Sequence, residues 1–137
     1  MEAKKLPIGY FIKQADDLLT KGINEIQSES GLTRTDWQIL NSIAEKEQSN
    51  EAELTMLLKP FAKENSVNAI LTKFKTDLLL NEKDNKLSLT KKGIELHKTC
   101  LEKQKLFRQT AMLDISELQY QQAVSTLQKI IENLTKR

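Results

Sequence analysis

Apolar residues recur at steps of three and four through the first 28 positions of the chain. Ile8, Phe11, Ile12, Ala15, Leu18, Leu19, Ile23 and Ile26 make up this series. The spacing places them on one face of an α-helix that runs from about Leu6 to Ser28. Ser30-Gly31 follows, and a glycine directly after a periodic segment is typical of a helix end.

The start of a second helix is marked by a capping box. Thr33 and Asp36 have the spacing at which each side chain can accept a hydrogen bond from the other residue's backbone N–H. Leu32 and Trp37 flank this box as a hydrophobic staple, and the helix is expected to end near Glu47.

Two further helices follow on either side of a proline. Asn50 with Glu53 predicts the cap of a short helix with three inward leucines, Leu54, Leu57 and Leu58. Lys59-Pro60 ends this helix, because proline disfavours helical backbone at the residue before it. A fourth helix is expected from about Phe61 to Asp77. Its buried stripe is predicted to be Val67, Ile70, Leu71, Phe74 and Leu78.

After this helix, the spacing of apolar residues changes from the helical three-and-four pattern to an alternation of every second residue. Residues 78–83 and Lys86–Leu89 read as the strands of a hairpin, joined by Asp84-Asn85, whose types tolerate the left-handed backbone of a two-residue turn. Thr90 is then expected to cap a long helix that reaches about Ala111. The last helix begins with a second capping box, Ser116 with Gln119. Its apolar stripe is Tyr120, Ala123, Val124, Leu127, Ile130, Ile131 and Leu134.

Four helices, a hairpin and two helices predict a mainly α protein with a winged helix-turn-helix core and a short two-stranded wing. We expect a single domain over residues 1–137. Within it, residues 31–92 would form a DNA-binding lobe, and residues 1–29 and 93–137 would form a helical dimerisation region.

The charge pattern agrees with a polyanion partner. Residues 59–92 hold eight basic and four acidic side chains, a net charge of +4, whereas the rest holds 13 basic and 15 acidic side chains, a net charge of −2. Positive charge concentrated in one segment is a sign of nucleic-acid binding. An ordinary solvated surface is the alternative explanation of the same charges.

In a helix-turn-helix the second helix enters the major groove, where amide and hydroxyl groups read base edges and lysines hold phosphates. The predicted contacts on the fourth helix are Lys63, Asn65, Ser66, Asn68, Thr72, Lys73 and Lys75. The predicted contacts at the tip of the hairpin are Lys83, Asn85 and Lys86.

Four short motifs resemble the multiple-antibiotic-resistance regulator (MarR) family in their order and spacing. The matching blocks are Gly31-Leu32-Thr33 with Trp37-Gln38-Ile39-Leu40, Glu53-Leu54-Thr55, Ser66-Val67-Asn68 with Ile70-Leu71 and Phe74, and Leu89-Thr90-Lys91-Lys92-Gly93. The resemblance covers nearly the whole chain. It implies a homodimeric, cytoplasmic transcriptional regulator on double-stranded DNA, often a repressor that small phenolic or other aromatic ligands release.

The chain departs from the family pattern at four places. Ala69 stands where the family has an arginine in its recognition helix, and Leu78 replaces the glycine before the wing. The loop after Leu58 is about two residues longer, and Lys83-Asp84-Asn85-Lys86 replaces the usual arginine-bearing wing tip. These features lead to two hypotheses about function. The first is a sequence-specific regulator on a pseudo-palindromic operator. The second is a winged-helix dimer that has lost strong DNA binding and acts as a protein-interaction module or antirepressor.

Three aromatic residues form a candidate ligand pocket. Tyr10, Phe11 and Trp37 can line a site for a small aromatic effector, or they can simply pack in the core. Cys100 can be a redox sensor or a packed thiol, and the single histidine, His97, has neither ligand-spaced neighbours nor a nucleophile partner.

Other classes of protein are not favoured. No apolar run approaches the length of a membrane span, no signal peptide is expected, and a single cysteine excludes an internal disulfide, so a cytoplasmic protein is expected. No glycine-rich phosphate loop, nucleophile elbow or paired carboxylate is visible. We therefore expect no enzymatic activity, no cofactor and no metal site.

Overall fold

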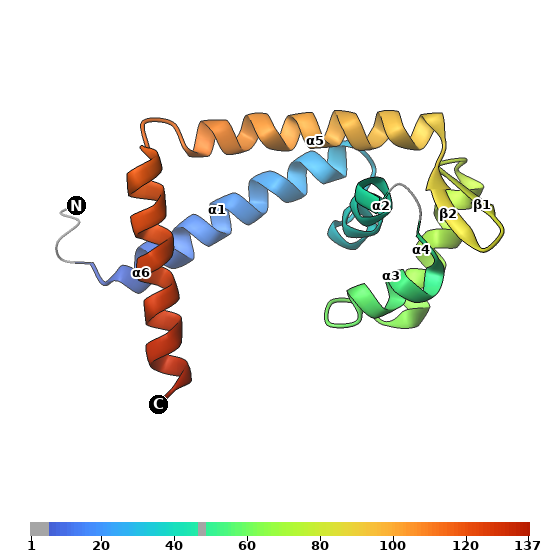
Figure 1. Cartoon of the computed structure of the whole chain (residues 1–137). Helices are drawn as coiled ribbons and strands as arrows, with labels where there is room; N and C mark the ends of the chain where they lie inside the picture. The colour runs from blue at the N-terminus through green and yellow to red at the C-terminus, as the bar shows by residue number, and fades with distance from the viewer. Residues whose placement is uncertain (1–5, 47–48) are drawn as a thin grey trace. The chain divides into compact units, whose positions relative to one another are not determined.

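The computed structural model describes residues 6–46 and 49–137, and its elements follow the predicted order (Figure 1). They are α1 (Ile8–Glu29), α2 (Arg34–Lys46), α3 (Glu51–Leu58), α4 (Glu64–Thr76), β1 (Leu80–Lys83), β2 (Lys86–Leu89), α5 (Lys91–Ala111) and α6 (Glu117–Thr135). The predicted fold class is confirmed, a mainly helical chain with a winged helix-turn-helix core. The chain divides into two compact units, one up to Phe107 and one from Arg108.

Local hydrogen bonds fix the starts of α2 and α3 as predicted. The Thr33 N–H donates to Asp36 Oδ2 at 2.9 Å, and the Asp36 N–H donates to Thr33 Oγ1 at 3.1 Å, which closes the capping box. Asn50 Oδ1 accepts from the Glu53 N–H at 2.8 Å. The predicted end of the second helix, Glu47, lies outside the described residues.

The predicted start of the fourth helix, Phe61, was wrong by three residues. α4 begins at Glu64, because Lys63 has extended backbone (φ −75°, ψ 154°) and stands at the N-cap position. Phe61 instead lies in the turn after α3, where its N–H donates to the Leu58 carbonyl at 2.8 Å. Its side chain is 70% exposed. The inward placement of Leu57 was also wrong, since α3 buries only Leu54 and Leu58, one turn apart.

The core of the first unit forms around α4. Val67, Leu71 and Phe74 are buried, with Ile70 partly buried against the same cluster. They pack with Ile39, Leu40 and Ile43 of α2, Leu54 and Leu58 of α3, and Leu80 and Leu87 of the hairpin. α4 therefore lies against α3 on one side and β1 on the other.

The predicted inward position of Leu78 is contradicted by the way in which α4 ends. Leu78 has a left-handed backbone (φ 63°), and its side chain is 68% exposed. The Leu79 N–H donates to the Phe74 carbonyl at 2.8 Å, and the Leu78 N–H donates to the Lys75 carbonyl at 3.1 Å. This is the Schellman arrangement, in which the left-handed position is normally a glycine. The reversal turns Leu78 outward and buries Leu79.

The predicted hairpin is present, but its first strand begins at Leu80 and not at residue 78, because Leu78 and Leu79 are in the turn that ends α4. Antiparallel pairing runs from Leu80 opposite Leu89 to Lys83 opposite Lys86. The connecting residues Asp84 (φ 52°) and Asn85 (φ 66°) both have left-handed backbone, as a two-residue turn of type I′ requires. Ser49 adds an isolated antiparallel bridge to Leu87, which ties the residue before the N-cap of α3 to β2.

α5 begins at a close approach of two backbone segments. Thr90 Oγ1 accepts from the Gly93 N–H at 3.0 Å and donates to the Leu78 carbonyl at 2.6 Å, so the predicted cap is confirmed. A side chain at Gly93 would place its Cβ 2.3 Å from the Leu79 carbonyl oxygen. Glycine is therefore needed here for space.

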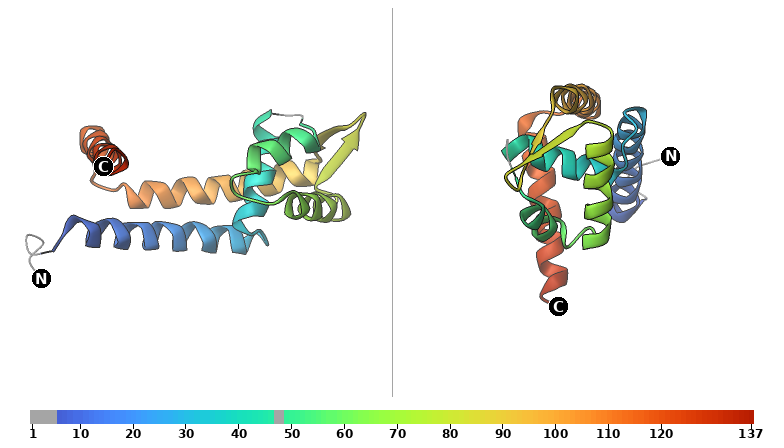
Figure 2. Two further views of the ribbon diagram at one scale, coloured as in Figure 1. Left: turned by 90° about the horizontal axis from the view of Figure 1, so that it is seen from below. Right: turned by 90° about the vertical axis from the view of Figure 1, so that its right-hand side faces the viewer.

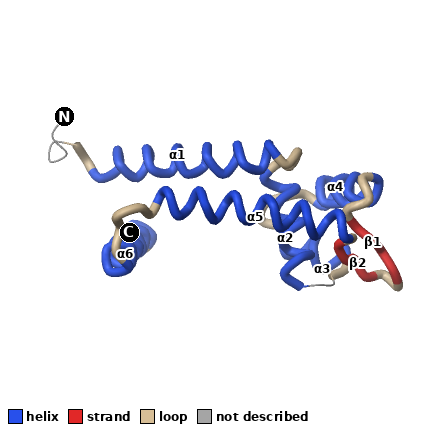
Figure 3. The backbone as a smooth tube through the Cα atoms, turned by 90° about the horizontal axis from the view of Figure 1, so that it is seen from above, coloured by secondary structure: helices blue, strands red, loops and turns tan. Residues whose placement is uncertain are grey.

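Within the first unit the C-terminal part of α1 lies beside α5 (Figures 2 and 3). The Phe107 ring occupies the space beside Gly22, where a Cβ would lie 2.1 Å from the ring. Lys103 forms an ion pair with Glu29 at 3.2 Å. The N-terminal half of α1 keeps its apolar face exposed: Ile8, Phe11, Ile12, Leu18 and Leu19.

The second unit is dominated by α6. Ser116 Oγ accepts from the Gln119 N–H at 3.1 Å, and Gln119 Oε1 accepts from the Ser116 N–H at 2.9 Å, which confirms the capping box. No residue of α6, all of which the structure describes, is buried. Its exposed apolar residues include Tyr120, Val124, Leu127, Ile131 and Leu134.

The end of α4 gives a stability prediction. Leu78→Gly should stabilise the protein by about 1 kcal/mol, because glycine has no Cβ to strain the left-handed backbone and the lost side chain is exposed. Urea unfolding followed by circular dichroism measures the change. Leu78→Ala removes the side chain but keeps the Cβ, so it should be near neutral. Equal effects of the two substitutions would show that the backbone is not strained.

Candidate nucleic-acid interface

The outward face of α4 follows from its buried stripe. Because Val67, Leu71 and Phe74 point into the core, the opposite side of a helix with 3.6 residues per turn carries residues 65, 69, 72 and 76. These are Asn65, Ala69, Thr72 and Thr76, and all four are exposed. The face is therefore uncharged, with three polar side chains and the methyl group of Ala69.

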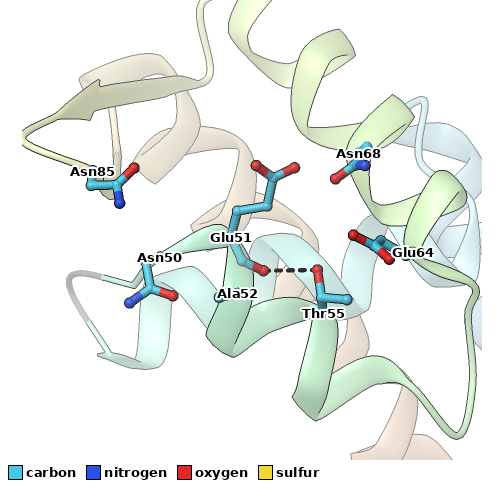
Figure 4. A pocket seen from close by; sticks show the side chains of 7 residues that line it. All are labelled: Asn50, Glu51, Ala52, Thr55, Glu64, Asn68 and Asn85. Atoms are coloured by element: carbon cyan, nitrogen blue, oxygen red, sulfur yellow. Dashed lines mark hydrogen bonds between the residues drawn. The ribbon is translucent and has the colours of Figure 1, made fainter.

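Ser66 and Asn68 lie on opposite flanks of this face. Ser66 lines a shallow crevice with Thr33 and Thr35 at the start of α2. Asn68 is half-buried and lines a second crevice with Asn50 and Thr55 of the α3 region and Asn85 of the wing tip (Figure 4). The structure thus brings Asn68 and Asn85, which were predicted separately, to the same crevice.

Two carboxylates line the crevice that holds Asn68. Glu51 of α3 and Glu64 of α4 stand on either side of it (Figure 4). Carboxylates repel phosphate groups but can accept hydrogen bonds from the amino group of cytosine. This part of the surface is therefore suited to base edges rather than to the phosphate backbone.

Two of the five predicted lysines are already paired within the protein. Lys73 Nζ lies 3.3 Å from Asp36 Oδ2, and the Asp36 side chain is only 4% exposed. Lys75 Nζ lies 3.0 Å from Glu82 Oε1 of β1, with both side chains more than a third exposed. These pairs lower the positive charge that α4 offers to DNA.

The other three lysines are exposed and lie around the ends of the interface. Lys63 precedes α4, and Lys83 and Lys86 are the last and first residues of the two wing strands. No ion pair joins any of the three to another residue within 6–46 or 49–137. The cations available for phosphates therefore lie at the helix start and on the wing.

Comparison with known proteins gives the fold but no sequence family. No family model matches the chain, and no curated protein matches it. MepR, a transcription regulator of the Staphylococcus aureus multidrug efflux pump MepA, has a TM-score of 0.76 and 15% identity, over 94% of this chain and 99% of its own. A MarR family protein of Mycobacterium tuberculosis in complex with DNA has a TM-score of 0.71 and 18% identity, over 92% and 98%. MarR from Escherichia coli, in its oxidised form, has a TM-score of 0.68 and 16% identity, over 92% and 95%.

The chain has the MarR-family winged-helix fold. The resemblance found in the sequence motifs is thereby confirmed at the level of the fold, and the similarity spans nearly the whole of each chain compared.

The three aromatic residues of the candidate ligand pocket do not meet within one chain. Tyr10 and Phe11 are exposed near the start of α1, where their rings contact edge to face at 5.3 Å. Trp37 lies in α2, beyond the other end of α1, and is 8% exposed. Its ring stacks on His97 at 5.0 Å, with an angle of 5° between the planes. In the single chain Trp37 is a core residue.

The Trp37–His97 stack was not predicted, and neither was its hydrogen-bonded neighbour. His97 Nε2 lies 2.8 Å from Asn41 Oδ1, which joins α5 to α2 across 56 positions of sequence. No local pattern marks so distant a pair. Cys100, three residues further along α5, is fully buried and its Sγ accepts from Gln104 Nε2 at 3.3 Å, which agrees with a packed thiol.

Two other kinds of site were searched for in residues 6–46 and 49–137. No group of three or more histidine, cysteine, aspartate and glutamate side chains is arranged to hold a metal ion. No helix in these ranges is both long and apolar enough to cross a membrane.

His97 makes the folding of the first unit sensitive to acid. Burial lowers the pKa of His97 below its usual 6.5 and outweighs the carboxylate of Glu45, which raises it. The folded state therefore favours the neutral ring, whereas the unfolded chain takes up a proton near pH 6.5. The contribution of neutral His97 to the free energy of unfolding is therefore fully present above pH 6.5. It is lost as the pH falls from 6.5 towards the lowered pKa of the folded state.

The wild type should therefore lose more stability than His97→Gln when the pH is lowered from 7.5 to 5. Glutamine can still bond to Asn41 but does not titrate. The free energy of unfolding, measured in urea at each pH, tests this. Parallel pH profiles for the two proteins would contradict it.

Proposed function

We propose that this protein is a DNA-binding transcriptional regulator that reads the major groove with α4. The observation that carries the proposal is the uncharged polar face of α4, held outward by the buried stripe and followed directly by a lysine-bearing wing. The shared fold supports it, because solved structures of this fold include regulators and a complex with DNA. The shared fold also favours a binding function for this protein over an enzymatic one.

Each polar group has a role that fits its position. Asn65 on the outward face can make a two-bond contact to adenine, and Thr72 and Ser66 can bond to further base edges. Lys63, Lys83 and Lys86 would hold phosphates and fix the register of the protein on the duplex. Asn68 and Asn85, which share a crevice, would contact DNA at the edge of the groove.

The regulator is proposed to act as a homodimer. The apolar faces of α1 and α6 are exposed in the single chain, and such faces are normally covered by a partner. A two-fold dimer binds a pseudo-palindrome whose half-sites lie about one helical turn apart. We further propose that the protein is a cytoplasmic repressor and that a small aromatic molecule is its effector. Because Tyr10 and Phe11 do not meet Trp37 within one chain, the effector pocket would have to form between these two residues and the second protomer of the dimer.

A second function is favoured by a different observation. Ala69, without charge or hydrogen-bonding group, lies at the centre of the outward face, and Lys73 and Lys75 are both ion-paired. A dimer with so little free charge on its recognition helix can instead act as a protein-interaction module or antirepressor with weak affinity for DNA.

A salt titration of DNA binding separates the two functions. If each of the three free lysines in each of two protomers neutralises one phosphate, the logarithm of the DNA-binding constant should fall with the logarithm of salt concentration. The expected slope is about −5, since each phosphate contributes roughly −0.9. Fluorescence polarisation on a duplex selected from a random library measures the slope. Absence of binding at low salt, on selected and random duplexes alike, would favour the antirepressor.

The base-reading role of Asn65 is tested with a matched lysine variant. Asn65→Ala should reduce discrimination between the selected duplex and one with the adenine replaced, by roughly 1–3 kcal/mol at that base pair. Lys86→Ala should weaken binding to both duplexes equally and make the salt slope shallower. An equal loss on both duplexes for Asn65→Ala would exclude it as a base reader.

Sedimentation equilibrium tests the dimer. The wild type should sediment as a dimer at tens of micromolar. Ile131→Glu places a charge in the α6 stripe at a residue that is 64% exposed, so it should yield a folded monomer. Ser125→Glu, outside the apolar stripe of the same helix, is the control and should stay dimeric. A monomeric wild type would contradict the proposal.

A further inference from the structure

The carboxylate of Asp36 is the most buried charge in the described part of the chain that has an ion-pair partner. Its side chain is 4% exposed and lies in the first turn of α2, where it lines the same crevice as Ser66 of α4. It accepts the Thr33 N–H at 2.9 Å, and Lys73 Nζ lies 3.3 Å from the same oxygen, Oδ2. A carboxylate that is removed from water needs such partners, because its desolvation is costly when they are absent.

Lys73 brings its charge to this site from a different helix. It lies on α4, 37 positions along the chain from Asp36, and its side chain is half exposed. Among the described residues this is the ion pair that joins α2 to α4. Its ammonium group is therefore engaged on the side of α4 that faces α2, next to the outward face and not at its centre.

The second ion pair of α4 differs in burial. Lys75 and Glu82 are 39% and 37% exposed, so water screens their attraction and the pair contributes little to stability. The Asp36 side chain, at 4% exposed, has much less access to water than either residue of that pair. The two pairs thus provide a matched comparison on one helix.

We propose that Lys73 is a positioning residue, which clamps the recognition helix to the start of α2 and does not hold a phosphate. The ion pair adds to the core packing in holding the rotation of α4 about its own axis, and so helps to keep the same side chains facing the groove. This inference rests on the proposed function, because the position of α4 matters for recognition only when α4 reads DNA.

The clamp itself can be tested without DNA. Lys73→Met keeps the apolar stem but leaves the Asp36 carboxylate unpaired, so the unfolding equilibrium constant should rise by about tenfold or more. Lys75→Met should change it by less than about threefold. Lys73→Arg should restore most of the stability. In an Asp36→Asn background the effect of Lys73→Met should be much smaller, since no buried charge is left unpaired.

The salt slope of DNA binding separates positioning from phosphate contact. Lys73→Met should weaken binding to the selected duplex but leave the slope unchanged, whereas loss of a phosphate contact in both protomers would make it shallower by about 1.8. Lys83→Met, at a proposed phosphate ligand, is the control and should show the shallower slope.

The outcomes distinguish the clamp from the function. Equal destabilisation by Lys73→Met and Lys75→Met, or a shallower slope for Lys73→Met, would overturn the clamp while wild-type binding stands. If the wild type does not bind DNA, the proposed function fails, and the unfolding measurements still decide whether Lys73 clamps α4.

Discussion

The burial of one stripe of α4 is the constraint on which the interface depends. Phe74, Leu71 and Val67 fill the space between α2, α3 and the base of the wing, and truncating a buried phenylalanine of this kind costs about 3–5 kcal/mol. A rotation of the helix would expose this stripe to water. The same packing therefore determines that Asn65, Ala69 and Thr72 face outward. The chemistry of the outward face is thus a consequence of core packing.

Electrostatics then divide the lysines of this region into two groups. Lys73 and Lys75 pair with carboxylates of α2 and of β1, and so contribute to the arrangement of the helix-turn-helix. Lys63 and the wing lysines stay free for a polyanion. Under the proposed function, the phosphate contacts would therefore lie at the start of α4 and on the wing. The outward face of α4 keeps uncharged amide and hydroxyl groups, within a MarR-like fold.

The sequence predicted those features that depend on neighbours in the chain. The capping boxes at Thr33 and Ser116 and the Asp84-Asn85 turn each involve residues at most three apart, and all three form as expected. The prediction that Leu78 points inward was wrong. Its side chain continues the apolar spacing of α4 in the sequence, but its left-handed backbone lies beyond the end of the helix. The pairs Lys73–Asp36 and His97–Trp37 were not foreseen. They join residues 37 and 60 positions apart, and only the folded chain brings them together.

The central claim is that the outward face of α4, with the wing, is the surface that contacts DNA. Amide chemical-shift mapping by nuclear magnetic resonance, during titration with a selected duplex, tests it most directly. The account predicts that the largest shifts fall within residues 63–76 and 83–86, with small shifts in α1 and along α5. Shifts concentrated on α1 or α5, with residues 63–76 unchanged, would contradict it.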